Sequence, residues 1–519
     1  MKTLHLKLVW ILPLIIIAAG IMLLFFENYQ EVTEPADQDW SRDWEVGETA
    51  AVKQPRIQKS KDGVRISYLT DSGITQHTYD DNYTETDEQH YSIPVDKFTS
   101  FYIEDDKLLY SDYYSLYRGD TEEKLTDIDG FIPTSSAAFF QKGPALYAID
   151  PTNYESSKLM TLTSNDSKVG TAETDEGTYL MEEYTDEKGR HLHFFEHVDN
   201  EVKKIGEAAF VPSGSESIKD IQFTVQNKEA AVLISTVQKQ SASGQMENHY
   251  YFGTTSFQEP LQTTSLSFID PVSSQPLREI SDMSLHPQKE GTSLLFKAVG
   301  ATNTRFGENS QFNIYKAPLG ASGVGEITRI SNTPDLSTHP VQIQDNSVIW
   351  VDKGGDSHKL LLSSQNPEII EKADTWNSRV LLGALGKTMG MLSYSFFGLL
   401  IMTFWYIWPL LFLVILMFVK RDALDQDRTW ILLTGIAIYL AAAILVRSPL
   451  FSEKLLARAP DYLSFPGSPI IFILGFALIS FGILKTGAKR RDWSIPVQIT
   501  YFISVHVALI TIFFGPYVL

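Results

Sequence analysis

The sequence predicts a multi-domain membrane protein, in which an all-β extracytoplasmic β-propeller of about seven blades is joined to an α-helical transmembrane bundle of one plus four helices. Three observations predict this architecture. Long uncharged apolar runs lie near both ends of the 519-residue chain. The polar middle consists of short runs of β-branched and aromatic residues separated by turn residues. Similar runs recur through the middle at a spacing of roughly 45–50 residues, the length of a four-stranded propeller blade.

The composition excludes several classes of protein. The formal net charge is −20, which argues against a nucleic-acid partner because phosphate binding needs clustered Lys and Arg. The chain contains no cysteine, so disulfides, zinc–thiolate sites, iron–sulfur clusters and cysteine nucleophiles are excluded. A large outer domain without disulfides favours a bacterial envelope protein over a secreted eukaryotic one.

The first apolar run, Val9–Phe26, carries no charge and follows a short basic segment with Lys2 and Lys7. At about 1.5 Å per residue the run covers roughly 27 Å, most of a bilayer core. A cleaved signal peptide is the alternative, but its apolar region would be about 7–15 residues long and end in a small-x-small site. The segment Leu23–Asn28 offers no such site. We therefore favour an uncleaved N-terminal anchor over residues 1–27.

Four more apolar runs lie in the C-terminal region, residues 395–519, and predict four membrane helices. They are Phe396–Val419, Thr429–Val446, Pro469–Leu484 and Ile495–Tyr517. Basic residues flank two of the loops between them: Lys420, Arg421 and Arg428 in one, and Lys485, Lys489, Arg490 and Arg491 in the other. The positive-inside rule places both loops in the cytoplasm. Five crossings then put the N-terminus inside, and the middle domain and Leu519 outside.

A semi-polar helix, Ser378–Tyr394, is predicted in the segment 374–394 before the second membrane helix. Its apolar residues recur every four positions, at Leu381, Leu385 and Met389. The helix either lies on the outer membrane surface or is a stalk that lengthens the next helix. Gly386 and Gly390 have the small-xxx-small spacing of closely packed helices.

The middle domain, residues 28–373, contains seven apolar strand candidates. These are Val64–Tyr68, Leu108–Tyr110, Ala145–Ile149, Tyr179–Tyr184, Ala231–Ser235, Leu294–Ala298 and Val348–Val351. Five of them have a more aromatic partner strand: Tyr114–Tyr117, His191–Phe195, His249–Phe252, Phe312–Tyr315 and Lys359–Leu362. Seven candidates predict about seven blades, with six or eight as alternatives. A ring leaves no open edge only if its last blade also pairs with a strand from the chain's start, so Trp44–Ile57 is predicted beside that blade.

One stretch of the middle domain is more specific than the rest. It consists of Phe312–Lys316, Ile327–Asn332, Thr338–Pro340 and Ser347–Val351, and Tyr114–Tyr117, Glu123–Thr126 and Ile132–Pro133 echo it. This pattern resembles the repeat of TolB-type, PD40-like (WD40-like) β-propellers. The family's Ser-Pro-Asp-Gly turn is missing, and only Asp345 and Asn346 stand near the place of its Asp-Gly. The resemblance implies a propeller that binds protein or peptide at its channel mouth and has no chemistry of its own.

Three groups of residues were weighed as possible sites. His191 and His193 alternate on one strand and, with His197, are a candidate metal site, although we favour a solvated strand face. Asp120, Asp127, Asp129 and Gly130 are a candidate calcium loop, but the EF-hand spacing is absent and an acidic turn is favoured. His506 is the one ionisable residue away from the ends of the apolar runs, and it is either a helix-packing residue or a proton sensor.

The sequence therefore predicts no catalytic residue, no cofactor-binding residue and no metal ligand. No P-loop, G-x-G-x-x-G, H-E-x-x-H or G-x-S-x-G motif occurs. The favoured function is a non-enzymatic binding or sensing module, anchored in the bilayer, with a protein partner in the membrane or envelope. The alternatives are a subunit of a transporter or permease and a membrane enzyme acting on lipid or wall polymers.

Overall fold

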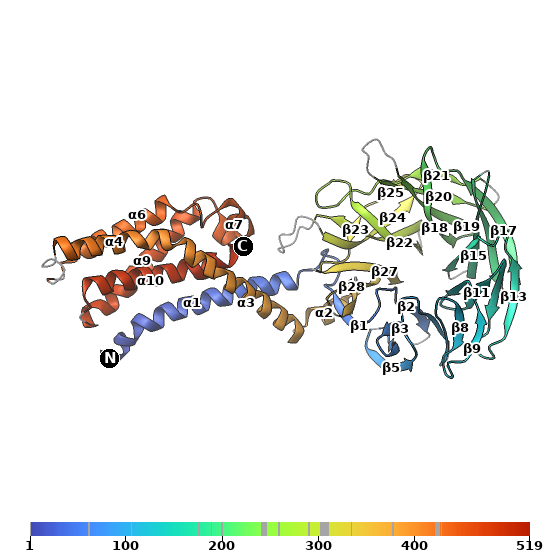
Figure 1. The fold of residues 1–519 in the computed structure, drawn as a ribbon, viewed down its shortest axis with the longest axis horizontal. Helices are drawn as coiled ribbons and strands as arrows, with labels where there is room; N and C mark the ends of the chain where they lie inside the picture. The colour runs from blue at the N-terminus through green and yellow to red at the C-terminus, as the bar shows by residue number, and fades with distance from the viewer. Residues whose placement is uncertain are drawn as a thin grey trace. The chain divides into compact units, whose positions relative to one another are not determined.

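The computed structural model divides the chain into two compact units (Figure 1). One unit comprises Met1–Thr33 and Trp376–Leu519, and the other is Glu34–Thr375. The structure describes every residue except 1, 61–62, 82, 105, 175–176, 188, 199–200, 240–245, 258–259, 289–290, 302–310, 334, 356, 376–377, 421–425, 427, 492 and 519. Two residues used in the predicted membrane topology, Arg421 and the C-terminal Leu519, thus lie outside the described part. The side chains of five basic residues from that prediction also lie outside it: Lys2, Lys7, Lys489, Arg490 and Arg491.

The unit Glu34–Thr375 is a ring of seven antiparallel sheets, which are the blades of a propeller (Figure 1). Blade 1 consists of β2 (Arg56–Ser60), β3 (Gly63–Thr70), β4 (Gly73–Tyr79) and β5 (Glu85–Ser92). Blade 2 consists of β6 (Ser100–Glu104), β7 (Lys107–Ser111), β8 (Ser115–Arg118) and β9 (Lys124–Asp127). Blade 3 consists of β10 (Gly130–Pro133), β11 (Ala138–Lys142), β12 (Ala145–Ile149) and β13 (Ser156–Thr161). Blade 4 consists of β14 (Lys168–Thr174), β15 (Gly177–Asp186), β16 (Gly189–Val198) and β17 (Glu201–Phe210). Blade 5 consists of β18 (Glu216–Gln226), β19 (Glu229–Gln238), β20 (Glu247–Thr255) and β21 (Gln262–Ser265). Blade 6 consists of β22 (Arg278–Gln288), β23 (Gly291–Gly300), β24 (Gln311–Gly320), β25 (Gly323–Val324) and β26 (Thr328–Arg329). Blade 7 consists of β27 (Leu336–Gln344), β28 (Ser347–Lys353), β29 (His358–Ser364) and β1 (Trp44–Thr49).

The seven apolar strand candidates fall into seven different blades, so the predicted blade number is confirmed. Six of them are the second strand of their blade. Ala145–Ile149 is the third strand instead, because the equally apolar Ala138–Lys142 precedes it across a two-residue turn. All five predicted partner strands pair with their candidates as third strands.

The ring closes with a strand from the start of the domain, as predicted. β1 pairs antiparallel with β29, with Trp44 opposite Leu362 and Glu48 opposite Lys359. The prediction was too long by a few residues, because Arg56 and Ile57 belong to β2 of blade 1. Pro55 separates the two strands, and proline cannot donate a ladder hydrogen bond.

A segment ahead of β1, residues 34–43, crosses from blade 6 to blade 7 and is called the strap. Trp40 is only 4% exposed and packs with apolar residues of both blades. The Ser41 hydroxyl accepts a hydrogen bond from the Ser364 backbone N–H at 3.0 Å. The Arg42 guanidinium donates to the carbonyl oxygens of Ala373 and Thr375. These bonds join the start of the propeller to the short helix at its end, α2 (Pro367–Asp374).

Asp352, at the end of β28, gives the propeller an expected pH dependence. Burial, with Asp335 and Asp43 nearby, raises the Asp352 pKa to about 6 although Thr333 and Ser337 donate hydrogen bonds to it. The folded state then binds a proton that the unfolded state has already released, so this residue's contribution to stability falls as pH rises from about 4 to 6. We expect Asp352→Asn to remove that decline and raise the free energy of unfolding at pH 7.5, by up to about 3 kcal/mol. Urea unfolding of both proteins at pH 4.5 and 7.5 measures it, and an equal pH dependence in the two would contradict it.

The other unit is helical. Its long helices are α1 (Lys2–Val32), α3 (Ser378–Ile401), α4 (Thr403–Val419), α6 (Thr429–Leu445), α9 (Ser468–Arg491) and α10 (Ile495–Phe514). The short α7 (Glu453–Arg458) and α8 (Asp461–Ser464) lie between α6 and α9, and η1 (Gly515–Tyr517) follows α10. Within the described part of the chain, four stretches are long and apolar enough to cross a membrane: Val9–Val32, Val380–Ile401, Ser468–Thr486 and Ile495–Tyr517. The apolar helices α4 and α6 are shorter.

The semi-polar helix predicted over Ser378–Tyr394 is not separate from the next one. α3 runs through it without a break to Ile401, and only Met402 separates α3 from α4. The predicted run Phe396–Val419 is therefore divided between two helices, and the stalk interpretation agrees better with the structure than a surface helix does.

Close helix packing occurs at glycines other than the predicted pair. A side chain at Gly386 or Gly390 would meet nothing within 4 Å. By contrast, a Cβ added at Gly20 would lie 2.6 Å from Ile512, and one at Gly435 would lie 2.6 Å from Ile499. Both contacts are with α10, the most buried of the four long apolar stretches. A third tight approach joins η1 to α3, because a Cβ added at Gly515 would lie 2.7 Å from Ser395.

Candidate functional site

The predicted histidine cluster lies on β16, but its members do not converge. His191 and His193 share one side of the strand, as their alternation predicts. His191 Nε2 is 2.9 Å from Asp186 Oδ1, and His193 Nδ1 is 3.4 Å from Glu182 Oε2. His197, farther along the strand, packs edge-on against Phe139 of blade 3. His191 and His193 also both pack against the ring of Tyr184. The two imidazoles are paired with different carboxylates, which agrees with a strand face and not with one metal centre.

The acidic residues considered as a calcium loop are also dispersed. Asp120 pairs with Arg118 at 2.5 Å, and Asp127 pairs with Lys124 at 2.5 Å. Asp129 accepts a hydrogen bond from the backbone N–H of Gly143 at 2.6 Å. These carboxylates are engaged separately in turns of blades 2 and 3, so they do not form a shared cation site.

His506 is buried where three helices meet. The Tyr439 hydroxyl of α6 lies 2.7 Å from its Nδ1, and the Ile473 carbonyl of α9 lies 2.9 Å from its Nε2. Both ring nitrogens have protein partners, which favours the helix-packing interpretation. The sequence does not predict a second polar contact, in which Lys387 of α3 pairs with Glu31 of α1 at 2.5 Å. Each of the two residues lies in one of the long apolar stretches.

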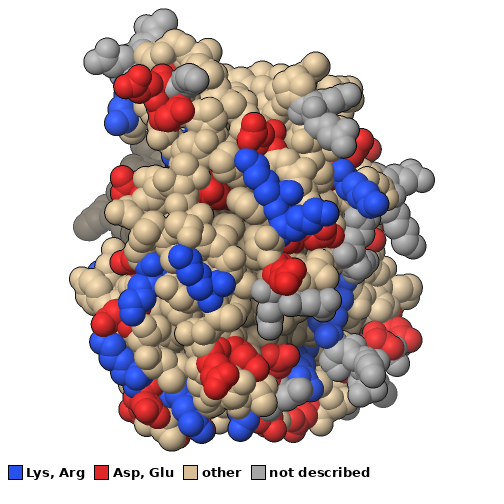
Figure 2. All heavy atoms as spheres, turned by 90° about the vertical axis from the view of Figure 1, so that its right-hand side faces the viewer, with Lys and Arg blue, Asp and Glu red and all other residues tan. Residues whose placement is uncertain are grey.

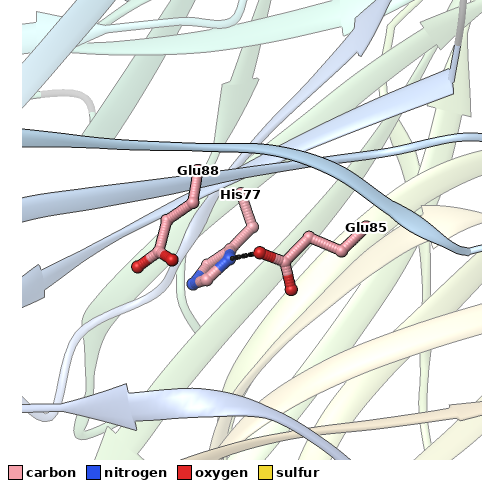
Figure 3. Close-up of side chains that lie close together, drawn as sticks. All are labelled: His77, Glu85 and Glu88. Carbon is pink, nitrogen blue, oxygen red and sulfur yellow. Dashed lines mark hydrogen bonds and ion pairs between the residues drawn. The ribbon is translucent and has the colours of Figure 1, made fainter.

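Blade 1 holds the one grouping of potential metal ligands in the described chain, His77 with Glu85 and Glu88 (Figure 3). Strand pairing places Glu88 of β5 directly opposite His77 of β4. One ligand atom from each residue lies within 4.8 Å of the others. His77 Nδ1 is 3.1 Å from Glu85 Oε1, and His77 Nε2 is 2.9 Å from the Tyr68 hydroxyl.

This donor set of one imidazole and two carboxylates suits a divalent cation such as Zn²⁺. Burial and four glutamates, at positions 45, 48, 85 and 88, raise the pKa of Tyr68 to about 12, so the surroundings are negative. Both nitrogens of His77 nevertheless already have protein partners, and both glutamates are exposed. The spacing of these residues matches no ligand motif, and only the pairing of β4 with β5 brings them together.

Blade 2 presents an exposed aromatic cluster, defined by Phe98, Tyr113 and Tyr114. Phe98 precedes β6, and the two tyrosines lie in the turn between β7 and β8. These turns lie at the same end of the blade, because Ser100 pairs with Ser111 at the ends of β6 and β7. The rings of Phe98 and Tyr113 are 4.8 Å apart, as are those of Tyr113 and Tyr114. The three side chains are 45%, 58% and 69% exposed.

Hydrogen bonds fix both turns that carry the aromatic cluster. The Asp112 carboxylate accepts from the backbone N–H groups of Tyr114 and Ser115, each at 2.7 Å. The Asp96 carboxylate accepts from the backbone N–H of Phe98 at 2.7 Å. Lys97 adds a cation, since its Nζ lies 4.7 Å from the centre of the Phe98 ring. The cluster is thus a preformed apolar surface with one positive charge beside it.

Other parts of the propeller surface carry mixed charge. Figure 2 shows Lys and Arg interspersed with Asp and Glu on the face that lies to the right in Figure 1. Lys204 of β17, for example, pairs with Glu207 at 2.7 Å. The visible face therefore presents no field of a single sign.

Comparisons with known proteins find only distant structural similarity. No protein-family model and no curated protein sequence matches the chain. The dihydro-heme d1 dehydrogenase NirN in complex with DHE is similar over 59% of this chain, at 10% identity and a TM-score of 0.33, and the match spans 63% of its length. The Pan2 WD40 domain of Neurospora crassa is similar over 63% of this chain and 96% of its own, at 11% identity and a TM-score of 0.35. A chain of the mitotic checkpoint complex is similar over 63% and 95%, at 12% identity and a TM-score of 0.34.

The fold class thus rests on the chain's own strand pairing. The seven sheets form the β-propeller that the TolB-type resemblance implies. Apolar helices accompany the propeller. Propellers of this kind often serve as protein-binding scaffolds, because loops at one end of a rigid ring converge.

Proposed function

We propose that this chain is a bacterial cell-membrane protein whose extracytoplasmic propeller binds a protein or peptide partner through the aromatic cluster of blade 2. The exposed ring group of Phe98, Tyr113 and Tyr114 carries the proposal. Tyrosine and other aromatic side chains dominate the binding energy of protein interfaces. Because Asp96 and Asp112 already hold the two turns, little conformational entropy is lost when a partner docks.

The helices support the membrane part of the proposal. Four stretches have the length and composition to cross a bilayer. The basic residues of the 420–428 and 485–491 segments favour a cytoplasmic location for both. In this arrangement α4 makes the second crossing and α3 is a stalk that lengthens it. The chain then crosses five times, and the propeller and the C-terminus lie outside the cytoplasm.

The proposed topology has a direct test, because the chain lacks cysteine. Single cysteines at Gln426 and Tyr114 are treated in intact cells with a membrane-impermeant maleimide. We expect labelling at Tyr114, and labelling at Gln426 only after the cells are opened. Labelling of Gln426 from outside intact cells would contradict the topology.

Site-specific photo-crosslinking tests the binding surface. A photoreactive amino acid replaces Tyr114, and in the matched control it replaces Val198, which is 53% exposed at the opposite end of a blade. We expect one discrete adduct in native membranes at position 114 and none of that size at position 198. Adding Phe98→Ala is expected to weaken the adduct at least about tenfold, since the neighbouring ring is an interface anchor.

Two results would contradict the proposed surface. One is equal adducts at positions 114 and 198, which would indicate random collision. The other is an adduct at position 114 that is unaffected by Phe98→Ala in protein shown to be folded. The transporter and enzyme alternatives receive no specific support from the described residues of the helical unit, where Asn28 pairs with Thr388, Tyr439 with His506 and Lys387 with Glu31.

A further inference from the structure

A small cavity lies at the same end of the propeller as the aromatic cluster, among blades 7, 1 and 2. Its volume is about 50 Å³, which corresponds to a few water molecules. The lining residues are Thr49, Lys53, Gln54, Arg56, Tyr68, Leu69, Thr99, Ser100 and Phe101. Phe98 of the aromatic cluster directly precedes Thr99 and Ser100 in the chain. The cavity admits one small polar group and is too small for a nucleotide or a sugar.

The lining of this cavity is cationic, although the chain as a whole is acidic. Lys53 and Arg56 both contribute to it, and no Asp or Glu does. Among the described residues, neither cation has a carboxylate within ion-pairing distance. Ser100 adds a hydroxyl donor, whereas the hydroxyls of Thr49 and Thr99 and the amide of Gln54 already donate to Leu69, Asp96 and Pro340. Such a lining suits an anion.

The two cations are held in place by carbonyl groups, which do not neutralise them. Lys53 Nζ donates to the Thr99 carbonyl at 2.6 Å, and Arg56 Nη1 donates to the Pro133 carbonyl at 2.7 Å. Burial lowers the pKa of Arg56 to about 10, although Glu173 across the channel opposes this. Burial also lowers the pKa of Lys53, and Asp96 opposes that shift. Both shifts show that the positive charge is only partly compensated.

The carboxylate of Glu173 is ionised and attracts Arg56, but it does not line the cavity and its oxygens are hydrogen-bonded elsewhere. It accepts from the backbone N–H groups of Ser135 and Ser136 at 2.6 and 3.0 Å, and from both hydroxyls. These bonds outweigh burial and lower its pKa. Among the described residues, the Arg56 guanidinium donates to the Pro133 carbonyl and forms no ion pair with Glu173.

We propose that this cavity binds a single oxyanion group, a carboxylate or a phosphate, carried by the partner that docks on the aromatic cluster. Lys53 and Arg56 supply the charge, and Thr99 and Ser100 stand next to the ring that would hold an adjoining apolar side chain. The inference rests on the proposed function and adds the chemistry of the partner: an anionic residue beside an apolar one.

Titration of the full chain in maltoside micelles with inorganic phosphate tests the inference. The ³¹P linewidth of phosphate is followed at constant ionic strength, and acetate is then added as a competitor. We expect the protein to broaden the line, Lys53→Gln to weaken the apparent affinity about tenfold, and Lys53→Arg to restore it. Lys204→Gln is the matched control, since it removes a charge from β17, outside both the cavity and the aromatic cluster. Competition by acetate at similar concentration would identify a carboxylate site, and its absence would identify a phosphate site.

Three outcomes would overturn the inference: no broadening by wild-type protein, equal broadening by the Lys53→Gln variant, or loss of broadening only in Lys204→Gln. Circular dichroism of each variant checks that it is folded. The result is independent of the crosslinking test. If phosphate shows no broadening but the adduct at position 114 forms, the anion site is contradicted and the binding surface is not. If phosphate is broadened but no adduct forms, the proposed binding surface is contradicted.

Discussion

Trp40→Ala is expected to lower the free energy of unfolding of the propeller by about 3–5 kcal/mol, the usual cost of truncating a fully buried large aromatic residue. The indole belongs to the strap and is 4% exposed. It fills the junction between blades 6 and 7, where its apolar neighbours are Leu295, Ile314, Ile330, Val348, Trp350 and Leu361. Alanine would leave a cavity lined by two blades, and neither blade can move into it without breaking its own strand pairing.

The matched control for Trp40→Ala is Tyr114→Ala. That residue is also a large aromatic of the propeller, but it is 69% exposed, and its truncation should change stability by less than about 0.5 kcal/mol. Urea unfolding of the full chain in maltoside micelles, followed by protease resistance of the propeller, measures both. An effect of Trp40→Ala no larger than that of Tyr114→Ala would mean that the strap does not contribute to the folded propeller.

The blade number was predictable because it depends on local features. Each blade has a short run of apolar residues that is buried between neighbouring blades, and such runs are visible in a linear sequence. Closure was predictable for a different reason, since an unpaired edge at the last blade requires a donor strand. The one misplaced strand, Ala145–Ile149, lies in a blade whose second and third strands are equally apolar, so hydrophobicity alone does not order them.

The candidate sites were not predictable, because each depends on a long-range arrangement. His77 and Glu88 are brought together by register between strands. The aromatic cluster arises because two turns from different hairpins end at the same edge of blade 2. Lys53 and Arg56 gain their common environment only when blade 7 closes on blade 1. In the helical unit, the charge of Lys387 contributes to the prediction of a semi-polar helix. Its ion-pair partner, Glu31, lies more than 350 residues earlier in the chain, so the pair is not visible in the linear sequence.

A disulfide between Glu48→Cys and Lys359→Cys is expected to raise the free energy of unfolding by about 5 kcal/mol, because it would close a loop that contains nearly the whole propeller. The two residues lie directly opposite each other on β1 and β29. Opposite residues on antiparallel strands have Cα atoms about 4.5–5.5 Å apart, within the range that a disulfide spans. The chain has no cysteine of its own, so the introduced pair is the only one that can oxidise. Reduction should return the stability to the wild-type value.

A control pair of cysteines tests whether the gain in stability depends on the pairing of β1 with β29. The control pair, Glu48→Cys with Lys353→Cys, places the second thiol on β28, two strands away from β1. That is about 10 Å in the hydrogen-bonding direction, beyond the reach of a disulfide. The first pair should therefore crosslink on mild oxidation of folded protein, as seen by altered gel mobility after denaturation, and the control pair should not. If both pairs oxidised equally, β1 would be detached from the ring often enough to meet either thiol, and the last blade would have an open edge in solution. If neither oxidised, β1 would close the ring in another register or not at all. Crosslinking of the first pair alone, with the stability gain, ties the closing strand to the stability of the whole propeller.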